Sequence, residues 1–252
     1  MATQNGKPTV VLVHGAFADS SSWTAVIQRL QVAGVNVIAA PNLLRGIKHD
    51  SAYVASRINQ VPGPVLAVGH SYGGAVITNA ATNAPNVVGL VYVAAFAPDE
   101  GETLGQVEAG SKDSVLNSAL VPLQYPAADG KQAVEFALNP AVAGEAFAAD
   151  VPAEEAAVIA AIQRPIAELA FSEPSGAPAW KKLPSWAIIP SADKAAGTDV
   201  LRSMAQRAGA EVTEAKGSHV IMISQPQIVT DVILKALASV GSGSAAGASA
   251  RR

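Results

Sequence analysis

The chain has 252 residues, half of them hydrophobic and only 15% charged, with a formal net charge of −3. A chain of this length buries about three quarters of its unfolded surface, so we expect one domain with a large core. The small net charge and the lack of a basic stripe argue against a nucleic-acid partner. There is no cysteine, which excludes disulfides and thiolate metal sites, and the four histidines are too scattered to predict a metal site.

The first seven residues are polar, and no stretch of the chain reaches the ~18 uninterrupted apolar residues of a membrane span. We therefore expect a cytoplasmic protein that does not contact a membrane. The sequence leaves the oligomeric state open, a homodimer included.

Short apolar runs alternate with segments of helical spacing along most of the chain. Such runs are typical of strands buried on both faces, and the alternation indicates a parallel sheet with right-handed crossovers. We expect six strands, at residues 9–13, 35–40, 64–68, 86–95, 185–190 and 211–215. The helices that accompany them are expected at 23–33, 50–59, 74–83, 199–208 and 225–240.

The alternation stops between residues 97 and 182, where we expect no strong strand. Helical segments are predicted at 131–138, 141–149 and 153–163, with turn signals between them. A separate helical domain is the alternative, but the strand pattern resumes at 185, which favours a helical cap inserted into one α/β domain. The predicted organisation is a core of residues 1–96 and 183–240, a cap of 97–182, and a tail of 241–252. The Gly, Ser and Ala composition of the tail predicts disorder.

The segment Gly69-His70-Ser71-Tyr72-Gly73 joins an apolar strand to a helix. A sharp turn there would hold Ser71 in a strained conformation and expose its hydroxyl above the sheet edge, as in a nucleophile elbow. Gly69 and Gly73 fit this interpretation, because side chains would collide where strand and helix cross closely. We predict that Ser71 is a catalytic nucleophile, and that the side chain of His70 points away from the site.

A serine hydroxyl needs a base to take its proton, and the base needs a partner that fixes its tautomer. Such groups sit on loops at the carboxyl ends of parallel strands. His219, just past the last expected strand, is the one histidine downstream of Ser71 and is the predicted base. Asp193, just past the fifth strand, is the predicted acid, with Asp99 after the fourth strand as its competitor.

An oxyanion formed during attack needs two preorganised N–H donors. The backbone N–H of Tyr72, directly after the nucleophile, is one candidate. The other should come from the loop after the first strand, where Gly15 allows close approach of the backbone. We predict that the second donor is the backbone N–H of Ala16.

The chain resembles the α/β-hydrolase superfamily, and within it the plant methylesterase and hydroxynitrile lyase group with its bacterial esterase relatives. The resemblance rests on three segments beyond the acid and base motifs, Val11-Leu12-Val13-His14-Gly15-Ala16, Gly69 to Gly74, and Ala94-Ala95-Phe96-Ala97-Pro98-Asp99. The chain order of Ser71, Asp193 and His219 is the one known for this superfamily. The resemblance implies an α/β-hydrolase fold with a six-stranded, mostly parallel sheet, and a cap that walls an apolar pocket. Phe17, Phe96 and Tyr125 are the aromatic candidates for substrate binding.

Two positions depart from the plant lyases that the chain resembles. They carry a threonine where this chain has Gly15 and a lysine where it has Val220, and those groups handle the cyanohydrin hydroxyl and the departing cyanide. The sequence therefore predicts a cofactor-free serine hydrolase that cleaves small carboxylic esters. The alternatives are a hydroxynitrile lyase or C–C bond hydrolase on the same fold, or a ligand-binding receptor without catalysis.

Overall fold

The computed structural model describes residues 7–127 and 129–249. Its centre is a six-stranded sheet in the order β2-β1-β3-β4-β8-β9, and every neighbouring pair in this sheet is parallel. The strands are β1 (Thr9–Val13), β2 (Val37–Ala40), β3 (Val65–His70), β4 (Val87–Val93), β8 (Ser185–Pro190) and β9 (Glu211–Ala215). The predicted α/β fold with a six-stranded sheet is confirmed.

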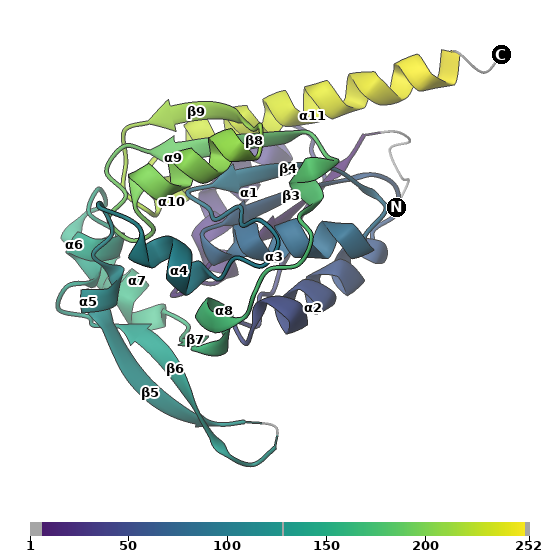
Figure 1. Ribbon diagram of the computed structural model, residues 1–252. Coiled ribbons are helices and arrows are strands. Elements are labelled where there is room, and N and C mark those ends of the chain that lie inside the picture. Colours follow the sequence, from purple (N-terminus) through teal and green to yellow (C-terminus); the bar gives the residue numbers. More distant parts are fainter. Residues whose placement is uncertain (1–6, 128, 250–252) are drawn as a thin grey trace.

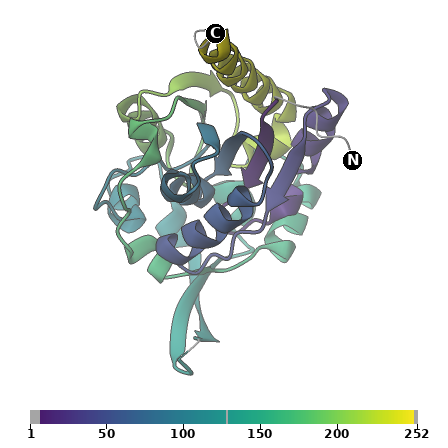
Figure 2. The ribbon, with the colours of Figure 1, turned by 90° about the vertical axis from the view of Figure 1, so that its right-hand side faces the viewer.

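Helices cover both faces of this sheet (Figures 1 and 2). On one face α1 packs against α11, and on the other α2 packs against α3, while α9 covers β8 and β9. These helices are α1 (Thr24–Val32), α2 (Ile47–Asn59), α3 (Tyr72–Ala80), α9 (Thr198–Arg207) and α11 (Pro226–Ser249). Because both faces are covered, strands β1, β3 and β8 are buried along their whole length, which explains their continuous apolar sequences.

The segment between β4 and β8 carries strands as well as helices, so the expectation of a purely helical cap is wrong. It contains α4 (Leu104–Ala109), α5 (Leu116–Ala119), β5 (Leu120–Pro126), β6 (Gln132–Leu138), α6 (Ala143–Phe147), α7 (Ala153–Ile162), β7 (Ile166–Ala167) and α8 (Leu169–Ser172). Strands β5, β6 and β7 form a second sheet, and the β5–β6 hairpin extends away from the rest of the molecule (Figure 1).

The helix predicted at 131–138 is therefore strand β6. It pairs with β5 in antiparallel register from Leu120 opposite Leu138 to Pro126 opposite Gln132. The apolar residues of this stretch fit a helix by their spacing, but Val134, Phe136 and Leu138 also alternate with period two. Pairing with β5, a long-range interaction that local spacing does not reveal, decides between the two.

Helix α11 continues through residues 241–249, for which the composition predicts disorder. No proline interrupts this stretch, and its alanines have the highest helix propensity of any residue. Residues 250–252, the rest of the predicted tail, lie outside the described residues. Among the helices of the described chain, none combines the length and the apolar character needed to cross a membrane.

Candidate active site

Ser71 occupies the tight turn between β3 and α3. Its backbone lies at φ 52° and ψ −125°, a region that a residue with a side chain rarely adopts. The glycines around it allow the crossing, because a Cβ on Gly69 would lie 2.5 Å from the carbonyl oxygen of Gly73. A Cβ on Gly73 would collide with the carbonyl oxygen of Val13 at the end of β1. The turn thus has the strained, closely packed geometry that the sequence predicts.

His219 and Asp193 form a buried hydrogen-bonded pair at the carboxyl ends of β9 and β8. The ring nitrogen Nδ1 of His219 lies 2.7 Å from Oδ2 of Asp193, and their side chains are 2% and 0% exposed. Because a carboxylate can only accept, Nδ1 of His219 carries the proton in this hydrogen bond, which leaves Nε2 free for proton transfer. The structure thus brings the predicted base and the predicted acid together.

The loop after β8 holds the Asp193 carboxylate from its other side. Oδ1 of Asp193 accepts hydrogen bonds from the backbone N–H groups of Ala195, at 3.0 Å, and Ala196, at 2.9 Å. The inserted segment holds this loop in turn, because the Ser114 hydroxyl donates to the carbonyl oxygen of Ala195 at 2.6 Å. The competing acid, Asp99, instead lies against the ammonium group of Lys181, with an N–O distance of 2.5 Å.

The backbone of His219 has a partner that the sequence analysis missed. Nε2 of His70 lies 3.0 Å from the carbonyl oxygen of His219, and the two imidazole centroids are 4.8 Å apart. The expectation that His70 points away from the site is wrong, because its fully buried ring packs against the ring of the predicted base. Burial, reinforced by the neighbouring His219, holds the pKa of His70 well below its usual range, so His70 stays neutral.

The loop after β9 is also fixed by the inserted segment. The hydroxyl of Ser218, next to His219, donates to Oδ1 of Asp150 and also contacts the carbonyl oxygen of Phe147, at 3.4 Å. The ring of Phe147 lies 5.0 Å from the His219 ring, centroid to centroid. The inserted segment therefore packs directly on the His219 ring and holds the backbone next to it.

The loop after β1 lies against the nucleophile turn. A Cβ on Gly15 would be 2.6 Å from the Cβ of Ser71, so only glycine allows this approach. The loop is tied to β2 through His14, whose Nε2 accepts from the backbone N–H of Asn42 at 3.1 Å. The side-chain amide of Asn42 donates back to the carbonyl oxygen of His14, at 2.9 Å. This reciprocal pair fixes the backbone that leads into Ala16.

Ser71 and His219 line one small pocket, whose volume is about 10 Å³. Four of the predicted site residues line it too, namely Ala16, Tyr72, Phe17 and Phe96. The structure does not bring Tyr125 to this pocket. Tyr125 lies on the β5–β6 hairpin, where the guanidinium of Arg45 covers its ring at 4.4 Å.

The remaining walls of the pocket come from residues that sequence reasoning did not select. They are Leu104, Leu116, Phe147 and Phe171 from the inserted segment, with Ala195 and Ala196 from the loop after β8. The alanines could have been found from their position next to Asp193. The four larger residues carried no such signal, because they lie on short elements whose packing the sequence does not reveal.

This geometry agrees with comparisons to known proteins. Residues 10–232 match the alpha/beta hydrolase family, so the chain belongs to that family. A carbendazim hydrolyzing esterase from Nocardioides sp. (strain SG-4G) is 34% identical over 107 residues. That match takes in 37% of the chain and 44% of the relative, so it spans less than half of the relative's length.

Solved structures show the same fold over nearly the whole chain. The crystal structure of polyneuridine aldehyde esterase superposes with a TM-score of 0.76 at 21% identity, and covers 91% of this chain and 98% of its own. A methylesterase from Arabidopsis gives a TM-score of 0.75 at 18% identity, with 92% and 99% covered. At these identities the likeness shows the fold, which is the α/β-hydrolase fold.

Proposed function

We propose that this chain hydrolyses carboxylic esters of small molecules through an acyl-enzyme on Ser71. The observation that carries the proposal is the buried pair of Asp193 and His219, of which His219 lines the same pocket as a serine at a strained turn. A buried, preorganised acid–base pair beside a potential nucleophile is the arrangement that acyl transfer needs. The esterase named among the relatives agrees with this class of reaction.

In the first step, Nε2 of His219 takes the hydroxyl proton of Ser71 while Oγ attacks the carbonyl carbon of the ester. The bond between that carbon and the alcohol oxygen then breaks, and the proton passes from His219 to the departing alcohol. A water molecule then attacks the acyl carbon and gives a proton to His219. The bond between the acyl carbon and Oγ of Ser71 breaks, His219 passes this proton to Oγ, and the acid is released. Asp193 keeps the imidazole in the required tautomer and stabilises it while it is charged.

The negative charge on the carbonyl oxygen would be stabilised by the backbone N–H groups of Ala16 and Tyr72. Tyr72 is the first residue of α3, and the N-terminus of a helix presents free N–H groups and a positive dipole end. Ala16 is held by the loop that Gly15 brings against Ser71. Both donors are thus part of rigid, buried backbone, which suits an oxyanion hole.

A hydroxynitrile lyase is a weaker candidate on this structure. Release of cyanide calls for a cation beside the leaving group, but the described residues that line the pocket include no lysine or arginine. Val220, which follows the base, has an apolar side chain that is 1% exposed. A receptor that binds ligand without turnover is separated from the esterase by kinetics rather than by structure.

Mixing the protein with excess p-nitrophenyl acetate tests the proposal. We expect a burst of about one nitrophenolate per chain followed by steady turnover, because the acyl-enzyme forms faster than water cleaves it. A single equivalent without further turnover would indicate a slowly acylated receptor. No nitrophenolate at all above the rate of buffer would contradict ester hydrolysis.

A further inference from the structure

The pocket at Ser71 is too small for an ester. Its volume of about 10 Å³ is close to the space that one water molecule needs. Any substrate must therefore displace part of the wall or extend into a neighbouring space. Two of the four phenylalanines in its wall, Phe17 and Phe147, pack edge to face, with their ring centroids 6.1 Å apart.

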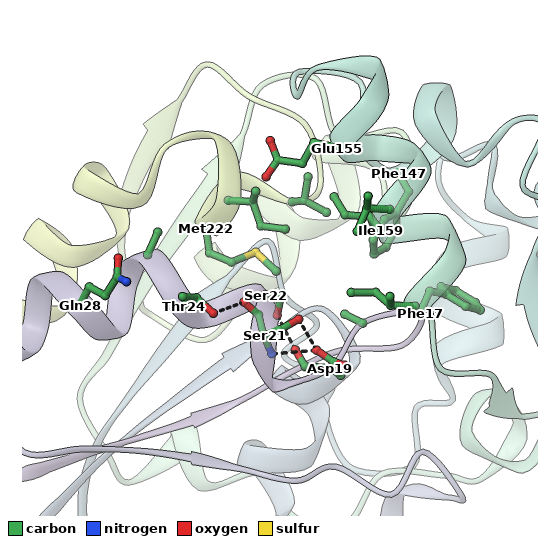
Figure 3. Close-up of a pocket in the computed structure, with 16 residues that line it drawn as sticks. Phe17, Asp19, Ser21, Ser22, Thr24, Gln28, Phe147, Glu155, Ile159 and Met222 are labelled. Carbon is green, nitrogen blue, oxygen red and sulfur yellow. Dashed lines mark hydrogen bonds between the residues drawn. The ribbon is translucent and has the colours of Figure 1, made fainter.

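A larger cavity, of about 300 Å³, lies directly behind these two rings. Phe17 and Phe147 line both the cavity and the Ser71 pocket, so they are the partition between the two spaces. Figure 3 shows the two phenylalanines at one end of this cavity and Gln28 at the other. The walls come from α1 and the 3-10 helix η1 (Ser20–Trp23), from α7, and from α10 (Ile221–Ser224).

The lining of this cavity is mostly apolar, while its exposed rim mixes polar residues with two large aliphatic ones. Val158 and Ile162 on α7 line it and are 57% and 48% exposed, which is unusual for large aliphatic side chains. Ile159, which is half-buried, and Met222, which is buried, also line it (Figure 3), and methionine adapts its shape to different ligands. A space of this size and character suits a ring or short hydrocarbon chain.

The two rings of the partition connect the Ser71 pocket with the cavity wall. Phe17 has a positive φ of 57°, a strained conformation for an aromatic residue, and it directly follows the proposed oxyanion donor Ala16. Phe147 is the last residue of α6, and beyond it the chain runs through a loop to α7, which forms the opposite part of the cavity wall. A rotation of either ring would join the cavity to the Ser71 pocket.

The charged side chains that line the cavity indicate which part of an ester it would bind. Two carboxylates, Asp19 and Glu155, belong to its lining, and no lysine or arginine is among the described residues that line it. The acid product of hydrolysis is an anion, which these carboxylates would repel, whereas the alcohol product is neutral. The leaving oxygen must also receive its proton from His219, and the next residue, Val220, lines the cavity.

We infer that this cavity is the subsite for the apolar alcohol group of the ester, and that Phe17 and Phe147 gate it. The inference rests on the proposed ester hydrolysis and adds the substrate class: esters of bulky, neutral, apolar alcohols. It also implies that a small alcohol group, such as methyl, does not need the cavity. Filling the cavity should therefore affect the two kinds of ester differently.

Ala25→Phe fills the cavity from α1, and Val158→Trp covers its mouth at an exposed site where folding is not at risk. The kcat/KM values for naphthylmethyl acetate and methyl acetate are measured for each variant. We expect the ratio of the two to fall about tenfold, the size of effect that loss of a hydrophobic pocket contact gives. The matched control is Val32→Trp, a valine that is 91% exposed on α1 and lies outside the lining, for which the ratio should not change.

The acyl side is tested with methyl hexanoate against methyl acetate. A fall in this ratio, with the naphthylmethyl ratio unchanged, would assign the cavity to the acyl group and overturn the inference. If neither kcat/KM ratio changes in either variant, the inference is also overturned. The Ser71 pocket would then open to substrate on its other side, at the residues of α4 and α8 that line it. Binding of naphthylmethanol, the alcohol product, is measured separately by fluorescence titration. This measurement does not depend on catalysis.

The titration separates failure of the subsite from failure of the proposed function. If the wild-type protein hydrolyses no ester but binds naphthylmethanol, and Ala25→Phe weakens this binding about tenfold, the cavity is a binding site on a non-esterase. If the wild-type protein hydrolyses esters but the two cavity variants bind naphthylmethanol as tightly as wild type does, the subsite inference is wrong and the esterase proposal stands.

Discussion

The hydroxyl of Tyr72 donates a hydrogen bond of 2.8 Å to Oδ2 of Asp50, in the buried space between α3 and α2. Asp50 is fully buried and also accepts from the backbone N–H of Arg45, at 2.9 Å. Burial, reinforced by the Asp50 carboxylate, raises the pKa of Tyr72 well above its usual range, so the hydroxyl keeps its proton. Tyr72, the residue that follows Ser71, is thereby anchored to a second helix.

Replacing Tyr72 by Phe should destabilise the protein. The change removes one donor from a buried carboxylate, and a hydrogen bond to a charged group contributes about 1.5–3 kcal/mol. We expect the free energy of unfolding, measured by urea denaturation, to fall by about that amount. Tyr125→Phe is the control, since Tyr125 lies on the hairpin and the change keeps the ring under Arg45. Equal stability of the two variants would show that the bond to Asp50 contributes little.

Asp193→Asn and Asp99→Asn should differ greatly in their effect on hydrolysis. An amide at 193 can donate to Nδ1 of His219, which would favour the wrong tautomer, and the cost is on the order of 10⁴ in kcat. Asp99 contacts Lys181 instead, so its replacement should change kcat less than about tenfold. Steady-state kinetics on p-nitrophenyl acetate compares the two variants. A larger loss in Asp99→Asn would assign the acid to Asp99.

Glu108, on α4, gives the stability of the protein a pH dependence. It is 4% exposed, and burial raises its pKa from 4.5 to about 7, partly offset by the Ser114 hydroxyl. The folded protein therefore holds this proton more tightly than the unfolded chain does. The bound proton on Glu108 contributes about 3 kcal/mol to the free energy of unfolding. This contribution is fully present below pH 4.5 and is lost as the pH rises through 7.

Glu108→Gln removes this titration while keeping the size of the side chain. Relative to wild type, we expect the variant to gain stability as the pH is raised from 4.5 to 8, as measured by urea denaturation at each pH. Other groups titrate in both proteins, so the difference between them isolates Glu108. If the difference in unfolding free energy between Glu108→Gln and wild type stays constant with pH, Glu108 ionises in the folded protein as it does in the unfolded chain.

Gly15→Ala tests the close approach of the first loop to the nucleophile. Its Cβ would lie 2.6 Å from the Cβ of Ser71 and 2.9 Å from the carbonyl oxygen of His70, so the backbone must shift. We expect a loss of about 1–3 kcal/mol in stability and a loss of most hydrolysis. Gly144→Ala is the control, since its Cβ would have ordinary contact with Ala156, at 3.6 Å. Full hydrolytic activity in Gly15→Ala would show that hydrolysis does not need the loop after β1 to lie this close to Ser71.

The parts of the fold that the sequence predicts are those with strong local signals. Apolar runs located five strands of the main sheet, and Gly69, Ser71 and Gly73 located the turn. The sixth strand, β9, has the mixed sequence Glu-Val-Thr-Glu-Ala and was found from its place after the helix at 199–208. The contact between Asp193 and His219 could be predicted because the carboxyl ends of parallel strands meet at one edge. The chain order of the two residues after Ser71, and the lack of another histidine downstream of it, pointed to the same pair.

The inserted segment could not be predicted in the same way. Strand β5 contains Pro122 and Pro126, which weaken a strand pattern, and β6 fits two periodicities until its pairing partner is known. The position of Tyr125 depends on that hairpin, which is why an aromatic residue expected near the substrate lies against Arg45. Phe147 and His70 both contact His219, which lies far from them in the sequence. No local motif predicts such contacts.

The central claim, that Ser71 is the nucleophile activated by His219, is tested most directly by covalent labelling with a fluorophosphonate. Mass spectrometry should find one label per chain, on the peptide that contains Ser71. We expect no label in Ser71→Ala, with hydrolysis reduced by about 10⁵ to 10⁶, and much slower labelling in His219→Ala. Ser118→Ala, at an exposed serine on α5, should label like wild type. Labelling of Ser71→Ala at full stoichiometry, with hydrolysis retained, would contradict the account.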